Sequence, residues 1–349
     1  MPKPGKKFLR ILLVVVAVLG LAVAVLDFHQ FAQKAKTVHI PSLVLAVVAS
    51  FGSFAFVALC LGYILKVLGA EIRFRQVFPI SYVSMAINCI VSTGGAGGLT
   101  ARAILLKRKN VEYGTSLLAS IVSILIANTV LLVFVIVGFA WVLFSGRASL
   151  AHDILAVIII GISIFAVVLC LYLMFHPEMR ARVPRRLLSF ANRIHRLVWR
   201  RDWFSREAME EGIREFGDGI EVIREKKRNL ILPTFYIFVD WLFVLLCLHC
   251  CFGATGGTVP SGVLVVGFAL GLFVSLISLI PGGLGVMEGS MAAVYASLGV
   301  PLEDAVLAVL LFRVVHNGIP FLISMTLFRP LFKESRESPG KRPEVRVKD

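Results

Sequence analysis

The stretch IPSLVLAVVASFGSFAFVALCLGYIL, residues 40–65, contains no charged side chain and is long enough to cross a bilayer as one helix. A helix needs about 20 predominantly apolar residues to span the hydrocarbon core. Within lipid every backbone hydrogen bond must be satisfied internally, so spanning segments are helices or closed barrels. Because one unbroken apolar run of this length fits a helix, the stretch predicts an all-α integral membrane protein.

Apolar stretches of similar length lie on both sides of this one. Residues 9–26, 116–144, 154–175, 230–252 and 306–328 each suit a helical span, so we expect about six transmembrane helices. The chain of 349 residues is 58% hydrophobic and only 16% charged, which excludes a water-soluble globule. In the stretch at 9–26 the apolar run comes after Lys6, Lys7 and Arg10, so it could be read as a cleaved signal peptide. The run is long for one and further spans follow, so we expect a retained signal-anchor helix.

The net charge of +15 is distributed as membrane topology requires. Basic residues lie at the edges of apolar spans and in a central segment, 177–228, that holds 14 Lys and Arg against 9 Asp and Glu. Cytoplasmic loops carry such an excess of basic residues. We therefore expect a protein of the cytoplasmic (inner) membrane with both termini in the cytoplasm, a polar tail at 333–349, and no nucleic-acid partner.

One apolar segment, residues 77–106, is interrupted by the Gly-rich string at 93–98 and has basic residues at both flanks. The simplest drawing is a re-entrant hairpin of two short helices that enters and leaves on the cytoplasmic side. Non-helical backbone at membrane depth survives only where protein or a wet cavity satisfies its polar groups.

A second apolar segment, residues 263–298, is broken at Pro281-Gly282-Gly283-Leu284-Gly285 and is followed by an acidic loop at 299–304. Each broken segment precedes a full span, and the predicted membrane sides of the two are opposite. We therefore predict an inverted repeat, about 41–145 against 229–330, within a single membrane domain at 1–332. The alternative is a coincidence of glycine kinks, because glycine is common in membrane helices.

A family resemblance rests on the second break. The run Pro281 to Glu288, continued by Gly299-Val300, Ala305 and Leu311-Phe312-Arg313, resembles the flippase-like membrane domain of bacterial lysylphosphatidylglycerol synthetases and their stand-alone relatives. The first Gly-rich turn followed by Arg102 is similar to that family's N-terminal motif, and the resemblance covers about residues 8–332. It implies lipid translocation, best supported for members that carry aminoacylated phosphatidylglycerol from the inner to the outer leaflet. Only a short polar tail follows residue 332, so synthesis of a lysyl lipid is not implied.

Three charged residues are the main candidates for substrate binding, because ionisable groups inside a membrane are costly. Glu288 could meet an ammonium headgroup or a proton, or could simply be a charge favoured at a helix N-terminus. Arg102 could grip a lipid phosphate with its guanidinium fork, or be an interfacial residue on the cytoplasmic side. Arg313, deep in the last span, could bind phosphate, pair with Glu288 or make a structural interhelical bond.

Further candidates lie near these three. His316 and Asn317 follow Arg313 by one turn and should point into the bundle, and Asp240 could pair with an arginine, relay a proton or be structural. The glycines of the two breaks are candidates because a residue without a Cβ lets backbone N–H groups approach an anion. They are Gly97, Gly98, Gly282 and Gly283. Asn88 and Asn128 are polar side chains of the first half that could hydrogen-bond the broken backbone.

Two other features have competing interpretations. Cys247, His249, Cys250 and Cys251 could suggest a metal site, but they lack zinc-ligand spacing and we expect small packing residues. In the central segment, apolar residues recur at helical spacing among charges. They predict an amphipathic helix, either at the inner leaflet or solvated and packed on the bundle. These residues are Met209, Ile213, Phe216, Ile220 and Ile223.

The function we expect is translocation of a phospholipid or similar amphiphile, with membrane lipids, anionic headgroups foremost, as partners. The rivals are a secondary transporter of a small anionic or amino-acid solute and an accessory membrane subunit without transport. The sequence contains no zinc-protease, nucleophile-elbow or Walker motif, so we expect no enzyme and no cofactor. A homo-oligomer or a lipid-synthesising partner enzyme stays open.

Overall fold

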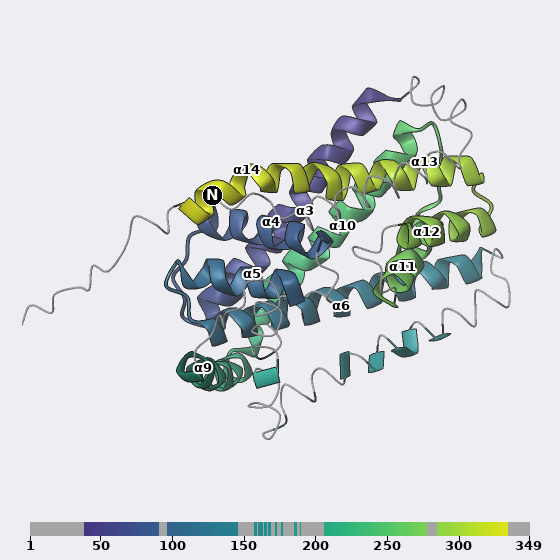
Figure 1. The fold of residues 1–349 in the computed structure, drawn as a ribbon. Coiled ribbons are helices and arrows are strands. Elements are labelled where there is room, and N and C mark those ends of the chain that lie inside the picture. The colour runs from purple at the N-terminus through teal and green to yellow at the C-terminus, as the bar shows by residue number, and fades with distance from the viewer. Residues whose placement is uncertain are drawn as a thin grey trace, which may run out of the picture.

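The computed structural model describes residues 38–90, 96–145, 206–277 and 285–333, together with scattered residues between 157 and 189. Within the described residues all regular elements are helices (Figure 1). In chain order they are α3 (Ile40–Val67), α4 (Phe74–Ile90), α5 (Ala96–Lys107), α6 (Tyr113–Phe144), α9 (Arg206–Glu225), η1 (Lys227–Leu230), α10 (Ile231–Ala254), α11 (Ser261–Ile277), α12 (Val286–Ser297), α13 (Leu302–Arg313), η3 (Val314–Gly318) and α14 (Ile319–Lys333).

Four of the predicted spans are confirmed as helices long and apolar enough to cross a membrane. They cover Ile40–Val67, Tyr113–Phe144, Lys227–Ala254 and Leu302–Leu327. The predicted span at 9–26 lies outside the described residues. Of the span predicted at 154–175 only part is described, and the residues described there are helical. The count of six therefore stays a prediction.

Within the described residues, two short helices flank each Gly-rich segment. In the first half α4 has 17 residues and α5 has 12. In the second half α11 has 17 and α12 has 12. Within each pair the two helices pack on each other. At about 1.5 Å per residue, a 12-residue helix is too short to cross the roughly 30 Å hydrocarbon core. Re-entry of each pair from one membrane side stays a prediction.

The helix ends repeat the same pattern in both halves. A residue with positive φ ends α3 and α5 in the first half and α10 and α12 in the second, namely Gly69, Asn110, Gly256 and Gly299. At each end the next residue donates its N–H to a carbonyl five positions earlier, as Ala70 does to Leu65 at 2.9 Å and Val300 to Tyr295 at 3.0 Å. This is the Schellman arrangement, which satisfies the last carbonyls of a helix. The first and third helices of each half therefore end alike.

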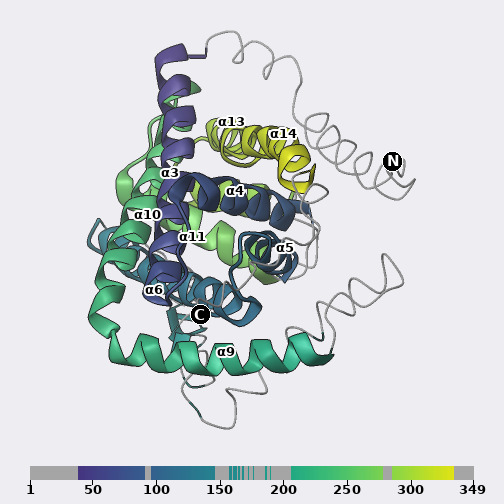
Figure 2. The same ribbon diagram turned by 90° about the vertical axis from the view of Figure 1, so that its left-hand side faces the viewer.

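Packing between the halves is reciprocal. The two leading helices, α3 and α10, lie side by side along one side of the molecule (Figure 2). The second helix of each half packs on the last helix of the other: α4 contacts α14, and α11 contacts α6. The order of the helices and the exchanged contacts agree with the predicted inverted repeat, which itself stays a prediction.

The central segment contains the predicted amphipathic helix, and its apolar face packs on the bundle. In α9 the side chains of Phe216, Ile220 and Ile223 are buried in a cluster shared with α3 and α6. The contact with α6 is close, because a Cβ on Gly114 would lie 2.3 Å from the Gly212 carbonyl oxygen. Of the two interpretations of this helix, packing on the bundle is the one that the structure supports.

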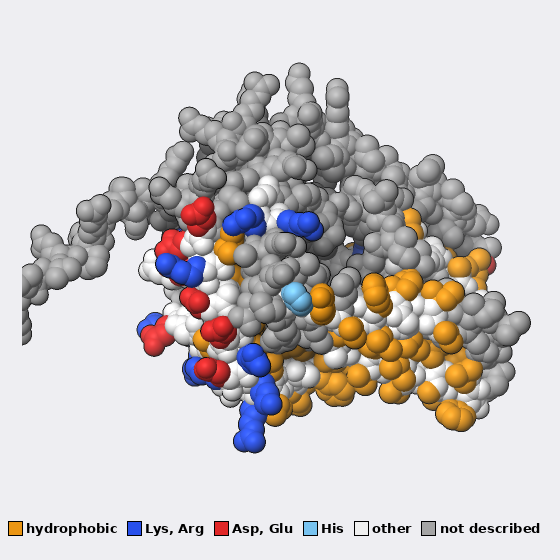
Figure 3. All heavy atoms as spheres, turned by 90° about the horizontal axis from the view of Figure 1, so that it is seen from below, with side chains coloured by type: hydrophobic (Ala, Val, Ile, Leu, Met, Phe, Trp, Pro, Cys, Tyr) orange, Lys and Arg blue, Asp and Glu red, His pale blue; other side chains and the backbone are white. Residues whose placement is uncertain are grey.

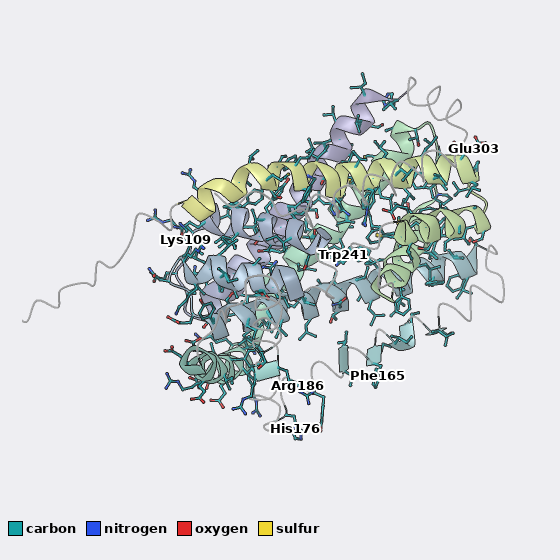
Figure 4. All side chains as sticks on the ribbon, in the orientation of Figure 1. Lys109, Phe165, His176, Arg186, Trp241 and Glu303 are labelled. Carbon is teal, nitrogen blue, oxygen red and sulfur yellow. The ribbon has the colours of Figure 1, made fainter. Side chains whose placement is uncertain are left out.

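The rest of the surface is divided by polarity. Seen from below, hydrophobic side chains cover much of the described face, and charged side chains gather at the end where α9 lies (Figure 3). Large apolar residues with high exposure include Val137, Phe144 and Phe235 on the long helices. The labelled Lys109 and Glu303 lie at opposite ends of the molecule, with Trp241 between them (Figure 4). An apolar belt between two polar ends is the surface that a bilayer-spanning bundle presents.

Candidate functional site

The start of α12 is organised by Glu288. Gly285 precedes the helix with φ of 80°, a conformation that glycine adopts without steric cost. The Glu288 Oε2 atom accepts a hydrogen bond from the Gly285 N–H at 2.8 Å. The carboxylate thereby satisfies a free donor in the first turn, where the helix dipole also favours negative charge.

The other carboxylate oxygen of Glu288 faces Arg313. The Nε atom of Arg313 lies 2.8 Å from Glu288 Oε1, and both side chains are largely buried. The Nη1 atom of Arg313 also lies 3.3 Å from the sulfur of Met287. The second break is therefore tied to the last span by an internally compensated ion pair, which is the pairing considered for Arg313 from the sequence.

The last span departs from α-helical geometry directly after Arg313. Residues Val314–Gly318 form a π-helical turn, a local feature often found at functional sites. With the Asn317 amide oriented to suit its neighbours, its oxygen accepts from Arg313 Nη1 at 2.7 Å. The His316 ring stacks on Phe312 and Phe54, with ring centres 5.1 and 5.4 Å away. His316 and Asn317 thus point into the bundle beside the ion pair.

Arg102 lies on α5, the related short helix of the first half, and its surroundings differ. Its side chain is buried, with 8% exposure, and Nη1 lies 3.4 Å from the Ser120 hydroxyl of α6. Its Nε atom is buried without a hydrogen-bond partner, as is the Ser116 hydroxyl one turn before Ser120. No carboxylate of the described residues forms an ion pair with Arg102. The first half therefore holds a buried, uncompensated cation.

Asp240 lies elsewhere, between α10 and α3. Its buried carboxylate accepts a hydrogen bond of 2.5 Å from the Ser53 hydroxyl. The thiol of Cys60 on α3 contacts the Ser123 hydroxyl at 4.0 Å. Among the described residues, no hydrogen bond or ion pair joins Asp240 to the Glu288–Arg313 pair.

The glycine candidates divide into described and undescribed positions. The Gly98 N–H donates to Asn88 Oδ1 at 2.9 Å, so Asn88 bonds the backbone beside the first break, as was expected. A Cβ on Gly98 would lie 2.6 Å from the Asn88 side chain, which gives this glycine a packing role between α4 and α5. Gly97 lies in the first turn of α5. Gly282 and Gly283 lie outside the described residues.

Other sequence candidates have local roles in the structure. Asn128 donates to the Ile124 carbonyl of its own helix at 2.9 Å and does not reach the break. Cys247, Cys250 and Cys251 are free thiols buried in the core around α10, which is the packing role expected of them. Neither feature contributes a group to the charged sites.

Sequence reasoning missed Ser116, Ser120 and Ser53, which contact or adjoin the buried charges. Serines 116, 120 and 123 recur at three- and four-residue spacing and so share one face of α6. That periodicity was the available signal, but single hydroxyls in a long apolar stretch barely change its hydropathy.

A family model and several known proteins are similar to this chain. Residues 8–324 match the family model described as "Lysylphosphatidylglycerol synthase TM region", which confirms the resemblance seen in the sequence. A UPF0104 membrane protein of Methanothermobacter thermautotrophicus is 25% identical over 317 residues, covering 87% of this chain and 90% of the relative. Another from Pyrococcus horikoshii is 26% identical over 265 residues, covering 74% and 78%.

A longer protein matches as well. The phosphatidylglycerol lysyltransferase of Staphylococcus aureus is 22% identical over 292 residues, which are 82% of this chain but only 29% of that protein. The similarity therefore concerns a membrane region that the two share. Together with the four long apolar helices, the family match identifies an integral membrane protein.

Proposed function

This chain belongs to the family of the lysylphosphatidylglycerol synthase transmembrane region, and from that premise we propose that it translocates a phospholipid or other lipid-like amphiphile across the cytoplasmic membrane. Such a function moves an intact molecule between leaflets and makes no bond. The name of the lysyltransferase relative connects the shared region with a phospholipid, which favours a lipid over a small solute as the transported molecule.

The observation that carries the proposal is the placement of buried charge on the short helices. Arg102 on α5 and Glu288 on α12 each follow a Gly-rich break, and each contacts the long helix that comes next. Placing an ionisable group at membrane depth costs about 2.5–3.5 kcal/mol on insertion scales. Charges buried on a short helix of each half therefore favour a function in binding a polar headgroup.

The reciprocal packing of the halves supports a mechanism. In transporters with inverted repeats, exchange of the conformations of the two halves opens a central site first to one side and then to the other. Here α4 packs on α14 and α11 on α6, and in this mechanism these contacts would carry a change in one half to the other. We propose that a lipid headgroup passes along the interior near Arg102 and Glu288 while its acyl chains stay in the bilayer.

The orientation follows from charge and is also a proposal. Lys109 and α9 lie at one end of the molecule, and Glu303 lies at the other (Figures 1 and 4). The basic end faces the cytoplasm by the positive-inside rule. The broken helices would then enter from opposite sides.

Leaflet exchange in liposomes tests the function. Purified protein would be reconstituted with fluorescent phosphatidylglycerol, phosphatidylethanolamine or a polyprenyl phosphate in turn, and inner-leaflet probe would be reached by an impermeant quencher only after exchange. We expect faster exchange of at least one lipid than in protein-free vesicles, and its loss in the Arg102→Ala/Glu288→Gln double variant. The exposed Arg224→Ala/Glu225→Gln double variant of α9 removes the same charges and should behave as wild type. Exchange of none of the lipids by folded protein contradicts the proposal and favours a solute transporter or accessory subunit.

A further inference from the structure

The two halves have a similar order of helices, but their buried charges are compensated differently. In the second half the Glu288 carboxylate neutralises Arg313 at 2.8 Å and also accepts the Gly285 N–H. In the first half the Arg102 guanidinium contacts a neutral group, the Ser120 hydroxyl of α6, at 3.4 Å. A hydroxyl carries no net charge, so Arg102 keeps its positive charge unbalanced.

The remaining buried carboxylate does not supply the missing charge by direct contact. Asp240 is hydrogen-bonded to Ser53 and forms no ion pair with Arg102 in the described part of the chain. A buried charge without a counter-charge is strongly unfavourable, and buried charges in proteins are normally paired. The uncompensated guanidinium is therefore best explained by an anion that the protein meets during its working cycle.

The groups around Arg102 define the shape of that anion. The Nε–H of Arg102 and the O–H of Ser116 are buried donors without partners, and they come from adjoining helices, α5 and α6. The Ser120 hydroxyl donates to the Ser116 carbonyl at 2.9 Å and is held beside the guanidinium. A guanidinium beside a hydroxyl matches the oxygen atoms of a phosphate, which accept several charge-assisted hydrogen bonds.

We propose that Arg102 and Ser116 form a binding site for the phosphate of a lipid whose headgroup carries net negative charge. This inference rests on the proposed function and names its substrate class: an anionic phospholipid is transported in preference to a zwitterionic or cationic one. The Glu288 carboxylate is already engaged by Arg313, so no described carboxylate beside the pair is free to receive an ammonium group. Both donors are shielded in this conformation, and the phosphate reaches them when α5 and α6 separate.

Phosphatidylglycerol and its lysyl ester provide a matched pair of probes. Both contain the same phosphodiester, but the lysyl ester adds ammonium groups that reverse the net charge. In the leaflet-exchange assay we expect wild-type protein to move phosphatidylglycerol at least tenfold faster than the lysyl ester. Equal exchange of the two, or faster exchange of the lysyl ester, overturns the substrate class while leaving translocation itself intact.

A binding measurement decides the site independently of transport. Phosphatidylglycerol added to detergent-solubilised protein should raise the unfolding temperature of wild type but not of Arg102→Gln. Ser116→Ala should require several-fold more lipid for the same shift, whereas Ser123→Ala on the same helix should respond as wild type. Arg102→Lys keeps the positive charge but lacks the planar guanidinium, so it should retain part of the rise in unfolding temperature. A partial rise in this variant shows that the loss in Arg102→Gln is a loss of binding and not of folding. An unchanged response in folded Arg102→Gln overturns the proposal.

Soluble glycerol phosphate distinguishes a lipid site from a site for free phosphate esters. We expect it to produce no shift at concentrations at which dispersed phosphatidylglycerol saturates the response. An equal shift from glycerol phosphate would assign the site to soluble anions and overturn the lipid assignment.

Discussion

The Nε atom of Arg313 lies 2.8 Å from Oε1 of Glu288, so an ion pair joins the short helix α12 to the long helix that follows it. The corresponding junction of the first half, α5 with α6, is made by Arg102 and Ser120 at 3.4 Å. The charge of Arg102 is thus left for something other than a protein carboxylate among the described residues. This difference within a repeated framework is the basis of the proposed transport of anionic lipid.

The Glu288–Arg313 pair should show strong energetic coupling. Removing one member of a buried ion pair leaves the other unpaired and typically costs about 3–5 kcal/mol. We expect Glu288→Gln and Arg313→Met each to lower the free energy of unfolding by roughly this amount, and the double variant to lose less than the sum. Unfolding in mixed micelles with all four proteins measures the coupling. Strictly additive losses would contradict a direct pair.

Gly114 should be intolerant of a side chain because α9 lies against it. A Cβ there would lie 2.3 Å from the Gly212 carbonyl oxygen and 2.5 Å from the Glu215 Cβ. We expect Gly114→Ala to destabilise the protein by about 1–3 kcal/mol, as overpacked contacts do. Gly217→Ala, on α9 itself, meets nothing within 4 Å and should be neutral or stabilising. Equal melting temperatures for the two variants would refute the close packing of α9 on α6.

The docking of α9 should depend on pH through Glu215. Its carboxylate accepts the Gly114 N–H at 2.8 Å, and burial raises its pKa from 4.5 to about 7. The neighbouring acids Glu112 and Glu211 also raise this pKa, and Lys107 lies nearby in an ion pair with Glu112. Between about pH 4.5 and 7 the Glu215 carboxyl is therefore protonated in the folded state and ionised in the unfolded state.

Protonation of Glu215 sets the direction in which stability changes with pH. Its stabilising contribution is complete below about pH 4.5 and is lost as the pH rises through about 7. Hydrogen exchange of α9 should accelerate between about pH 4.5 and 7 beyond the intrinsic pH effect, and Glu215→Gln should remove that excess. The exposed Glu225→Gln should keep it. An excess that persists in Glu215→Gln would assign the pH dependence to another group.

Membrane orientation can be measured by thiol labelling on a cysteine-free background. Lys109 and Glu303 lie at opposite ends of the molecule (Figure 4). We expect an impermeant maleimide to label Glu303→Cys in intact cells and Lys109→Cys only after the membrane is opened. The reverse pattern would invert the topology and place α9 outside.

The long helices could be predicted closely because their physical signal is large. The stretch at 40–65 became α3 (Ile40–Val67), and the one at 116–144 became α6 with one extra turn at its start. Burial of uninterrupted apolar surface in lipid dominates all local preferences in such segments. The Gly-rich segments were predicted to interrupt the apolar stretches because glycine destabilises the interior of a helix.

The partners of the charged residues were much harder to predict. The sequence identified Glu288 and Arg313 separately and left their pairing as one alternative, because the contact joins α12 to α13 at a distance set by the turn at Gly299. It offered nothing to connect Arg102 with Ser120, since this contact depends on how α5 packs on α6. The role of α9 was undecided because its apolar face suits either lipid or protein, and only Phe216 and Ile220 buried against the bundle distinguish the two.

The most direct test of the central claim is the rate at which fluorescent phosphatidylglycerol leaves the inner leaflet of vesicles that contain the purified protein. An impermeant quencher should reach probe from both leaflets with wild-type protein. With the Arg102→Ala/Glu288→Gln double variant, as in protein-free vesicles, it should reach only the outer leaflet. Quenching confined to the outer leaflet with folded wild-type protein, or full quenching with the double variant, would contradict lipid translocation through this site.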